Sequence, residues 1–383
     1  MECLRCGNKD PTYFYKGHKG YYCRKCVRFK RILLEEEMEP YDYEISKEAD
    51  DYSLKYELTK YQKEASRKVL DYLNEGDVLL NCVCGAGKTE IVVLSIAEYL
   101  KRGLKVCFAI SRREVVIELE KRFRSIFRKA RVVGVYGGHH EVLTGDLIVC
   151  TNHQLFRYYK TFDLLVLDEV DAFPLRGDET LFNISKNSSR GRIIYSTATV
   201  DSELIRSIGE RRYRTVELFV RPSLKPLCIP RLYLMPRFIL YFCLYGIMRK
   251  MTNQCIVFVS RKRECGRLFS IFRNFFSCIY AYAGMEERDE YINDFRNGKY
   301  QFIFATSILE RGITIKGVNV IVLYDRKDAY SKSALIQMFG RVGRSVEDTS
   351  GEAYLLTSVL SMEILGTIGY LRKANSHLEV SLL

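Results

Sequence analysis

Two short motifs, about 250 residues apart, constrain the fold of this chain more than any other feature. The later one is QMFGRVGR, residues 337–344, whose two arginines lie three residues apart and share one face if the segment is helical. Planar guanidinium groups favour bidentate contacts with phosphate oxygens. The only obvious cradle for a phosphate lies near residue 85. The two motifs therefore predict two lobes that close on one nucleotide.

The phosphate cradle is the segment CVCGAGKTE, residues 82–90, which follows an apolar run. It matches the phosphate-loop pattern G-x-x-x-x-G-K-[ST] in its last three positions, Gly87–Thr89. Cys82 replaces the first glycine, and Gly85 supplies backbone freedom instead. In such loops, backbone amides at a helix N-terminus and Lys88 hold phosphates, and the threonine hydroxyl binds magnesium. A purely structural glycine turn is the alternative.

Carboxylates follow the apolar run LLVL within the segment LLVLDEVDAFP, residues 164–174. Asp168 and Glu169 come at the carboxyl end of a predicted parallel strand, where α/β proteins bind their ligands. Asp168 can hold magnesium, and Glu169 can orient or deprotonate an attacking water. A capping Asp-Glu pair is the alternative. Its position about eighty residues after a phosphate loop favours the hydrolytic interpretation.

Strand-like and helix-like segments alternate along most of the chain. Strands are predicted at 78–82, 106–110, 132–136, 147–150, 164–167 and 193–195, and again at 255–259, 279–282, 302–305, 318–323 and 353–356. This alternation indicates parallel sheets covered on both faces. We therefore predict an α/β protein with one lobe at residues 56–220 and another at 221–383. The apolar run at 238–248 predicts a buried helix.

Four cysteines near the N-terminus form two C-x-x-C pairs with sixteen residues between them: Cys3, Cys6, Cys23 and Cys26. This spacing fits the four-cysteine zinc pattern, in which the thiolates complete a closed, structural site. We expect a zinc module at residues 1–30 and a linker or short helix at 31–55.

Aromatic and basic side chains are interleaved in the zinc module. They are Tyr13, Phe14, Tyr15, Tyr21 and Tyr22, with Lys9, Lys16, Lys19, Arg24 and Lys25. Such residues can stack on bases and pair with phosphates. Alternatively, the aromatic rings form the minimal core of a small zinc ribbon. The sequence leaves both interpretations open.

The charge balance points to a polyanionic partner. The chain has 383 residues and a formal net charge of +13, which favours nucleic acid first and an anionic membrane surface second. No run approaches the roughly 18–20 apolar residues that a membrane-spanning helix needs. The N-terminus lacks the basic and apolar regions of a signal peptide. We therefore expect a cytoplasmic protein with reduced thiols.

In this order, the motifs resemble those of superfamily-two helicases, which have two RecA-like lobes. Within that superfamily the chain is similar to the ComFA family, the late-competence DNA translocases of Gram-positive transformation. The resemblance covers nearly the whole chain and rests on the four-cysteine module, VCGAGKTE, CTNHQLFRYYKTFDLLVLDEVDAFP, FATSILERGITIKGVNV and LIQMFGRVGRS. Cys82 and Phe339 depart mildly from the family's pattern.

The resemblance implies roles for individual residues. The catalytic set is Lys88, Asp168, Glu169, Arg341 and Arg344. ATP contacts are Gln62 of an adenine-reading glutamine motif, Gly85, Ala86, Gly87, Lys88, Thr89 and Gln337. Thr89 and Asp168 would hold magnesium. Nucleic-acid contacts are Arg112, Arg113, Thr151, His153, Ser260, Thr306 and Gly312.

The resemblance also implies an ATP-driven motor on single-stranded DNA that helps to draw incoming DNA through a membrane channel. ATP, magnesium and zinc would be its cofactors. Its partners would be single-stranded DNA, a ComFC-type phosphoribosyltransferase-like protein and the membrane DNA-uptake channel. A homo-oligomer and a peripheral position at the inner face of the cell membrane stay open.

Four rival interpretations are kept. A PriA-type replication-restart helicase has similar phosphate loops and zinc cysteines, but there the cysteines interrupt the helicase body, whereas here they precede it. An RNA helicase fits the N-terminal zinc module less well. A non-hydrolysing DNA clamp or scaffold is disfavoured by the intact Lys88, Glu169 and Arg344. A membrane-surface adaptor would use the positive charge alone.

Overall fold

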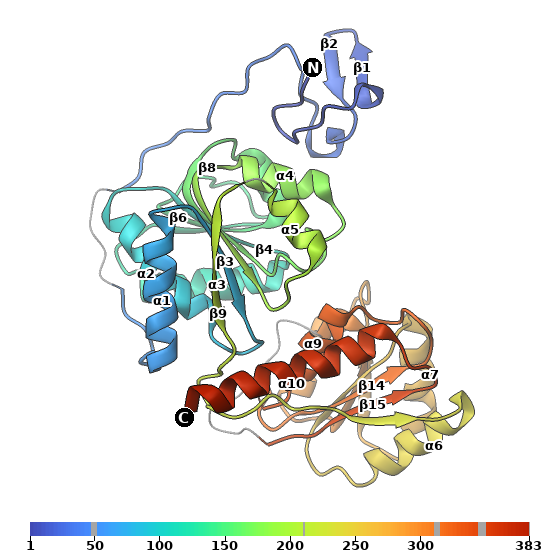
Figure 1. The fold of residues 1–383 in the computed structure, drawn as a ribbon. Coiled ribbons are helices and arrows are strands. Elements are labelled where there is room, and N and C mark those ends of the chain that lie inside the picture. Colours follow the sequence, from blue (N-terminus) through green and yellow to red (C-terminus); the bar gives the residue numbers. More distant parts are fainter. Residues whose placement is uncertain (47–51, 210, 310–314, 344–349, 383) are drawn as a thin grey trace. The chain divides into compact units, whose positions relative to one another are not determined.

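The computed structural model describes residues 1–46, 52–209, 211–309, 315–343 and 350–382. They divide into two compact units. The first comprises Met1–Cys82 and Gly87–Leu218, and the second comprises Val83–Ala86 and Phe219–Leu383. Each unit contains one large parallel sheet with helices packed on it (Figure 1). The predicted α/β fold with two parallel-sheet lobes is therefore confirmed.

The sheet of the first unit has seven strands in the order β5-β6-β4-β7-β8-β3-β9. They are β3 (Asp77–Cys82), β4 (Val106–Ile110), β5 (Val132–Val135), β6 (Leu147–Thr151), β7 (Phe162–Asp168), β8 (Ser189–Thr197) and β9 (Tyr213–Leu218). Every residue of β3, β4 and β6 is buried, as expected for parallel strands covered on both faces. All six predicted strands are present. Strand β9 escapes prediction because half of it is exposed and polar.

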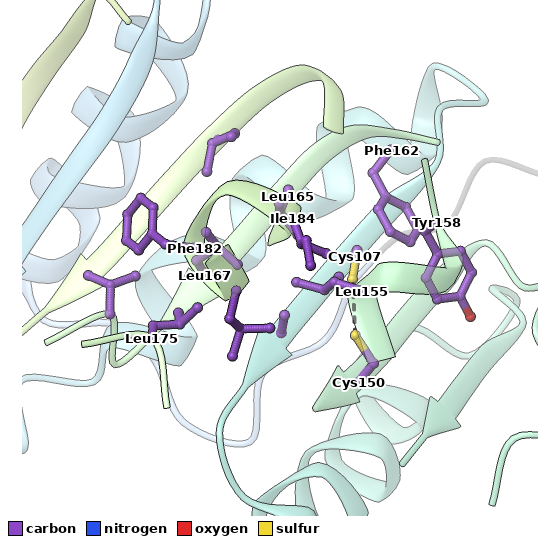
Figure 2. Close-up of a cluster of buried hydrophobic side chains, with 14 of the residues drawn as sticks. Cys107, Cys150, Leu155, Tyr158, Phe162, Leu165, Leu167, Leu175, Phe182 and Ile184 are labelled. Atoms are coloured by element: carbon purple, nitrogen blue, oxygen red, sulfur yellow. Dashed lines mark hydrogen bonds between the residues drawn. The ribbon is translucent and has the colours of Figure 1, made fainter. Parts of the chain in front are cut away.

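The helices of the first unit are α1 (Lys60–Leu73), α2 (Lys88–Lys101), α3 (Arg113–Ile126), α4 (Glu179–Asn187), α5 (Ser202–Ile208) and the 3₁₀ segment η3 (Asn152–Arg157). Figure 2 shows part of the core, where apolar side chains of α4, η3 and the central strands meet. Cys107 and Cys150 are fully buried there as free thiols, with their sulfur atoms 3.6 Å apart. Both behave as small core residues.

The N-terminal module contains the 3₁₀ turns η1 (Pro11–Tyr13) and η2 (Val27–Phe29) and the hairpin β1 (Phe14–Gly17) with β2 (Gly20–Cys23). The segment that follows, up to residue 46, is extended rather than helical. It is held on the first unit, because Tyr41 N donates to Tyr159 O at 3.0 Å and Ser46 N donates to Asp146 Oδ1 at 2.7 Å. The described part of the linker is thus anchored.

The sheet of the second unit has six parallel strands in the order β10-β15-β14-β11-β13-β12. They are β10 (Arg231–Leu234), β11 (Cys255–Phe258), β12 (Cys278–Ala281), β13 (Phe302–Ala305), β14 (Asn319–Tyr324) and β15 (Ala353–Thr357). The helical segments are α6 (Arg237–Met248), α7 (Lys262–Phe272), α8 (Arg288–Arg296), η4 (Ser307–Leu309), α9 (Lys332–Phe339) and α10 (Met362–Leu382). All five predicted strands are present, and β10 is an additional edge strand.

Helix α6 corrects one expectation. Its predicted burial holds for one face only, where Leu240, Leu244 and Met248 are buried. Phe238 and Phe242, four residues apart on the other face, are 70% and 76% exposed. The run is apolar all round, and burial was therefore the wrong inference from composition alone. Within the described ranges, no helix combines the length and apolar character that crossing a membrane requires.

Candidate nucleotide site and four-cysteine centre

The phosphate loop takes the backbone shape that its glycines allow. Gly85 and Gly87 both have φ near 83°, in the left-handed region, and helix α2 begins at the next residue, Lys88. A Cβ atom at Gly87 would also clash with Gln62 Nε2. Cys82 is fully buried as the last residue of β3, so the chain needs no glycine there. The loop thus brings its glycines to the start of α2, where a helix N-terminus can bind a phosphate.

A buried carboxylate lies in the same unit. Asp168 ends β7, is only 7% exposed, and accepts hydrogen bonds from Ser196 Oγ at 2.7 Å and from the Glu169 backbone amide at 3.0 Å. Burial raises the pKa of the Asp168 carboxyl, and the positive charge of Lys88 acts in the opposite direction. A buried carboxylate that is held rigidly but only partly neutralised fits a divalent cation. Thr89, the second residue of α2, carries the hydroxyl that fits the same ion.

Hydroxyl groups at and just after the carboxyl end of β8 hold two of the three carboxylates in the Asp168–Asp171 segment. Besides the bond from Ser196 to Asp168, Thr199 Oγ1 donates to Asp171 Oδ2 at 2.8 Å. Sequence reasoning gave this serine no individual role. The sequence does show that β7 and β8 both end in polar residues. The structure pairs these two strands side by side, which brings Ser196 to Asp168. Glu169 has a φ of 56°, a strained value for a residue with a side chain.

Gln62 lies beside the phosphate loop. Its side-chain oxygen accepts hydrogen bonds from the Thr59 backbone amide at 3.0 Å and from the Thr59 hydroxyl at 3.2 Å, which completes a capping box at the start of α1. This arrangement points the amide nitrogen toward Gly87. The position of Gln62 next to the loop is therefore fixed by its own helix, and its adenine-reading role stays a prediction.

The arginine motif departs from the expected geometry. Helix α9 ends at Phe339, and residues 340–343 form a turn in which Gly343 has a φ of 62°. The helical placement expected of the two arginines is therefore wrong for Arg341, which lies in the turn after α9 with its backbone amide donating to Met338 O at 3.2 Å. Arg341 is buried. Arg344 lies outside the described residues.

The apex of the phosphate loop belongs to the second unit and packs on the arginine motif. Cys84 Sγ donates to Gln337 Oε1 at 3.0 Å. A Cβ atom at Gly340 would lie 2.6 Å from Cys84 Cβ, so only glycine allows this approach. Gln337 and the loop apex, both predicted ATP contacts, are thus brought together.

Arg221 is a functional candidate that sequence reasoning missed. Its buried guanidinium donates to the carbonyl oxygens of Cys84 at 2.9 Å, Gly340 at 3.0 Å and Val342 at 2.8 Å. One side chain therefore holds the loop apex and the turn that carries Arg341. No local pattern marks this arginine in the sequence, because its partners are backbone atoms more than a hundred residues away.

The predicted nucleic-acid contacts in the first unit fall at two places. Arg112 and Arg113 stand at the start of α3, with the Arg113 guanidinium 5.1 Å from the centroid of Tyr136. Thr151 and His153 stand where β6 passes into η3. Desolvation lowers the pKa of His153, and the positive charge of Arg28 adds to this effect. A neutral imidazole at that position can hydrogen-bond but adds no charge.

In the second unit, Ser260 and Thr306 follow the adjacent strands β11 and β13. Ser260 Oγ donates to Asp325 Oδ1 at 3.0 Å. Both hydroxyls thus lie at the carboxyl edge of the sheet. Gly312 lies outside the described residues. The nucleic-acid contacts expected of these residues stay predictions.

The four cysteines of the N-terminal module form one buried cluster. Their sulfur atoms all lie within 4.8 Å of one another, with Cys3–Cys26 at 3.7 Å and Cys6–Cys23 at 3.8 Å. Tetrahedral zinc with Zn–S bonds of about 2.3 Å separates its sulfur ligands by about 3.8 Å. Arg5 also donates to Cys26 Sγ at 3.2 Å, which favours a thiolate. The donor set fits zinc.

The module is fastened to the body of the first unit. Arg28 pairs with Asp178, and Lys25 pairs with Glu179 at 3.3 Å. Asn187 Nδ2 donates to the carbonyl oxygens of residues 4 and 5 at 3.1 and 3.0 Å. The buried ring of Phe29 lies 5.9 Å from that of Phe156 in η3. The cysteine cluster and the core of the first unit are therefore continuous.

Lys88 of the phosphate loop, the buried Asp168 and the neighbouring Glu169 lie in one unit, and the arginine motif lies in a second parallel-sheet unit. Together these features define a helicase-like ATP-hydrolysing enzyme. Residues 55–202 match the family described as type III restriction enzyme, res subunit, and residues 237–346 match the helicase conserved C-terminal domain. The fold is similar to that of Saccharomyces cerevisiae Dbp5 bound to RNA and ADP BeF3. That match has a TM-score of 0.62 at 19% identity and covers 82% of this chain and 87% of the other.

The chain belongs to the ComFA family. It is 32% identical to competence protein ComFA of Bacillus subtilis (strain 168), over 91% of this chain and 80% of the relative. It is 30% identical to competence protein ComFA of Streptococcus pneumoniae (strain ATCC BAA-255 / R6), over 97% of this chain and 90% of the relative. The resemblance inferred from the motifs is thus confirmed.

Proposed function

We propose that this protein is an ATP-driven motor that moves along single-stranded DNA and serves DNA uptake during competence. The observation that carries the proposal is the buried Asp168 carboxylate, fixed by Ser196 in the same unit as the Lys88 loop. Family membership supports the competence setting, because both relatives are named competence proteins. In this proposal residues 1–30 are the zinc module, 31–55 the linker, 56–220 the ATP-binding lobe and 221–383 the second lobe.

The hydrolytic step follows from preorganised charge. The loop residues Gly85, Ala86 and Gly87, together with Lys88, hold the phosphates, and Gln62 reads the adenine. Thr89 and Asp168 hold magnesium, which when bound offsets negative charge on the phosphates. Glu169, placed next to Asp168, orients the attacking water and accepts its proton. Since Asp168 is already fixed by two hydrogen bonds, little reorganisation is needed.

The arginine motif supplies transition-state stabilisation. We propose that Arg341 and Arg344 contact the γ-phosphate and that Gln337 supports them. An arginine supplied in this way is worth about a thousandfold or more in rate. The clamp formed by Arg221 on the carbonyl oxygens of Cys84, Gly340 and Val342 supports this role, because it fixes the turn in which Arg341 stands.

Movement along DNA requires that hydrolysis change how the strand is held. The proposed contacts are Arg112, Arg113, Thr151 and His153 in one lobe, and Ser260, Thr306 and Gly312 in the other. Hydrolysis removes the γ-phosphate contacts of the arginines, so the lobes separate and grip the strand alternately. Contacts of this kind go to the phosphate backbone and carry no sequence information.

The finer assignments belong to the same proposal. The protein works in the cytoplasm, peripherally at the inner face of the cell membrane, with zinc in its cysteine cluster. Its protein partners are a ComFC-type phosphoribosyltransferase-like protein and the membrane DNA-uptake channel. The net charge of +13 supports a polyanionic partner but does not distinguish DNA from RNA.

ATP turnover with single-stranded DNA, duplex DNA and RNA in parallel tests the proposal. Single-stranded DNA should stimulate turnover most. A preference for RNA would remove the competence role and favour an RNA helicase. Turnover that no nucleic acid stimulates would contradict the motor itself.

A further inference from the structure

The N-terminal hairpin has two faces of different character. Phe14 pairs with Cys23, and their side chains face the cysteine cluster and the core. Tyr15 pairs with Tyr22, so both rings point to the opposite face, since neighbouring residues in a strand alternate. Their rings meet edge to face with centroids 5.6 Å apart. Neither tyrosine belongs to the core, whereas Phe14 does.

A guanidinium completes this outer face. Leu33 forms an antiparallel bridge to Tyr22, which brings residues 31–33 alongside β2. Arg31 then lies over the Tyr22 ring, with its guanidinium carbon 4.5 Å from the centroid. Tyr15 is 54% exposed. The outer face, defined as Tyr15, Tyr22 and Arg31, therefore presents the exposed Tyr15 ring and the exposed Arg31 guanidinium beside the half-buried Tyr22 ring.

Positive charge predominates in the module that carries the outer face. Residues 1–34 contain nine Lys and Arg but only two Asp and Glu. Within the described chain, five of the nine are exposed and form no ion pair: Lys16, Lys19, Arg24, Lys30 and Arg31. An acidic run bounds the surface at one edge, where Glu35 accepts a hydrogen bond from the Tyr21 amide at 3.0 Å.

We propose that the outer face is a binding site for single-stranded nucleic acid, separate from the contacts made by the helicase motifs. The exposed Tyr15 ring lets a base stack, and the cations of the module attract the phosphates. A protein partner fits less well, because a stable protein interface buries about 800 Å² on each side. Two tyrosines and one arginine on a four-residue hairpin offer far less. The inference rests on the proposed single-stranded DNA motor and adds a site to it.

The attachment of the module predicts how this site behaves. Ion pairs at Lys25 and Arg28 and the buried ring of Phe29 tie the module to the first unit. A strand held on the outer face therefore stays with that unit whatever nucleotide is bound. Its contribution to DNA affinity should be the same with and without ATP, unlike that of contacts shared between two lobes.

The test measures binding of fluorescent oligodeoxythymidylate to the full-length protein, with and without a non-hydrolysable ATP analogue. Tyr15→Ala combined with Arg31→Gln should weaken binding about tenfold in both nucleotide states, since stacking and a phosphate contact are lost. Tyr15→Phe keeps the ring and should bind like the wild type. Tyr56 offers a matched control, being 70% exposed with Lys55 over its ring at 5.2 Å, outside the hairpin. Tyr56→Ala should leave binding unchanged.

Zinc content and DNA-independent ATP turnover should stay at wild-type values in these variants. If the double variant loses zinc, Arg31→Gln alone still decides, because it should flatten the salt dependence of binding by about one charge. Unchanged binding and unchanged salt dependence, beside a wild type that binds DNA, would overturn the proposed site and leave the motor intact. A wild type that binds no single-stranded DNA would overturn the motor first.

Discussion

The nucleotide half-site of the first unit and the outer face of its hairpin are built in opposite ways. Asp168 is buried and fixed by two hydrogen bonds, whereas Tyr15 is more than half exposed and held by ring contacts alone. Catalytic groups stabilise a transition state best when they are already in place and do not need to reorganise. A surface over which a strand moves must instead accept any base, and stacking on an exposed ring does so. The comparison teaches which residues should resist substitution and which should not.

The largest expected effect is on ATP turnover, and it should leave DNA binding by the outer face unchanged. Lys88→Ala or Asp168→Ala should reduce DNA-stimulated ATP turnover by about a thousandfold or more, because each removes charge that the transferred phosphate needs. Binding of single-stranded DNA without nucleotide should stay within about twofold, since neither residue faces the hairpin. Turnover is measured by phosphate release, and folding is checked by the melting temperature. Wild-type turnover in either variant would refute the nucleotide site.

Substitution of Arg221 should have the next largest effect on turnover. Arg221→Gln leaves buried carbonyl oxygens at Cys84, Gly340 and Val342 without their donor, so the melting temperature should fall by several degrees. Turnover should fall about tenfold to a hundredfold through displacement of the loop and the arginine turn. Arg231, an exposed arginine paired with Glu352, gives the matched control Arg231→Gln. Equal effects of the two substitutions would show that the clamp has no special role.

The hydrogen bond between Ser196 and Asp168 predicts a smaller, pH-dependent effect. Burial raises the pKa of Asp168, and the bond from Ser196 lowers it. Ser196→Ala should therefore raise this pKa further, so that the carboxylate proposed to bind magnesium becomes protonated at a higher pH. Turnover should fall about tenfold at neutral pH, and the acid limb of its pH profile should move upward. Ser196→Thr keeps the hydroxyl and should restore both; an unmoved acid limb in Ser196→Ala would contradict this account.

Removing a proposed zinc ligand should affect the hairpin more than the nucleotide site. Cys26→Ser should abolish stoichiometric zinc and lower the melting temperature, because the cluster is continuous with the core. Single-stranded DNA binding should weaken several-fold, about as much as with the hairpin variants. DNA-independent turnover should persist. Cys243, a half-buried free cysteine outside the cluster, provides the control Cys243→Ser. Retained zinc in Cys26→Ser would refute the four-cysteine centre.

Most of the fold was predictable from the sequence because its signals are local. Each buried parallel strand appears as a short apolar run, and all eleven predicted runs became strands in the two sheets. Strands β9 and β10 escaped because exposed edge strands are mixed in polarity. The exposed face of α6 could not be foreseen, since an apolar helix does not reveal which of its faces a sheet covers.

The candidate site was only partly predictable. Lys88 was predicted from the phosphate-loop pattern, and Asp168 and Glu169 from their position after an apolar strand. The four cysteines were predicted from the spacing of the two C-x-x-C pairs. Arg221 and Ser196 did not, because their importance comes from partners that only the folded chain brings near. The end of α9 before Arg341 was not foreseen, because the spacing of two arginines does not show where a helix ends. The sorting of Phe14 inward and Tyr15 outward needed the hairpin register.

The central claim is that ATP hydrolysis drives movement along single-stranded DNA. The most direct measurement is displacement of streptavidin from the biotinylated end of a single-stranded oligonucleotide. The wild type should displace it when ATP is present, and Lys88→Ala should not. DNA-stimulated ATP hydrolysis without any displacement, with the biotin placed at either end, would contradict the account and favour a non-translocating DNA clamp.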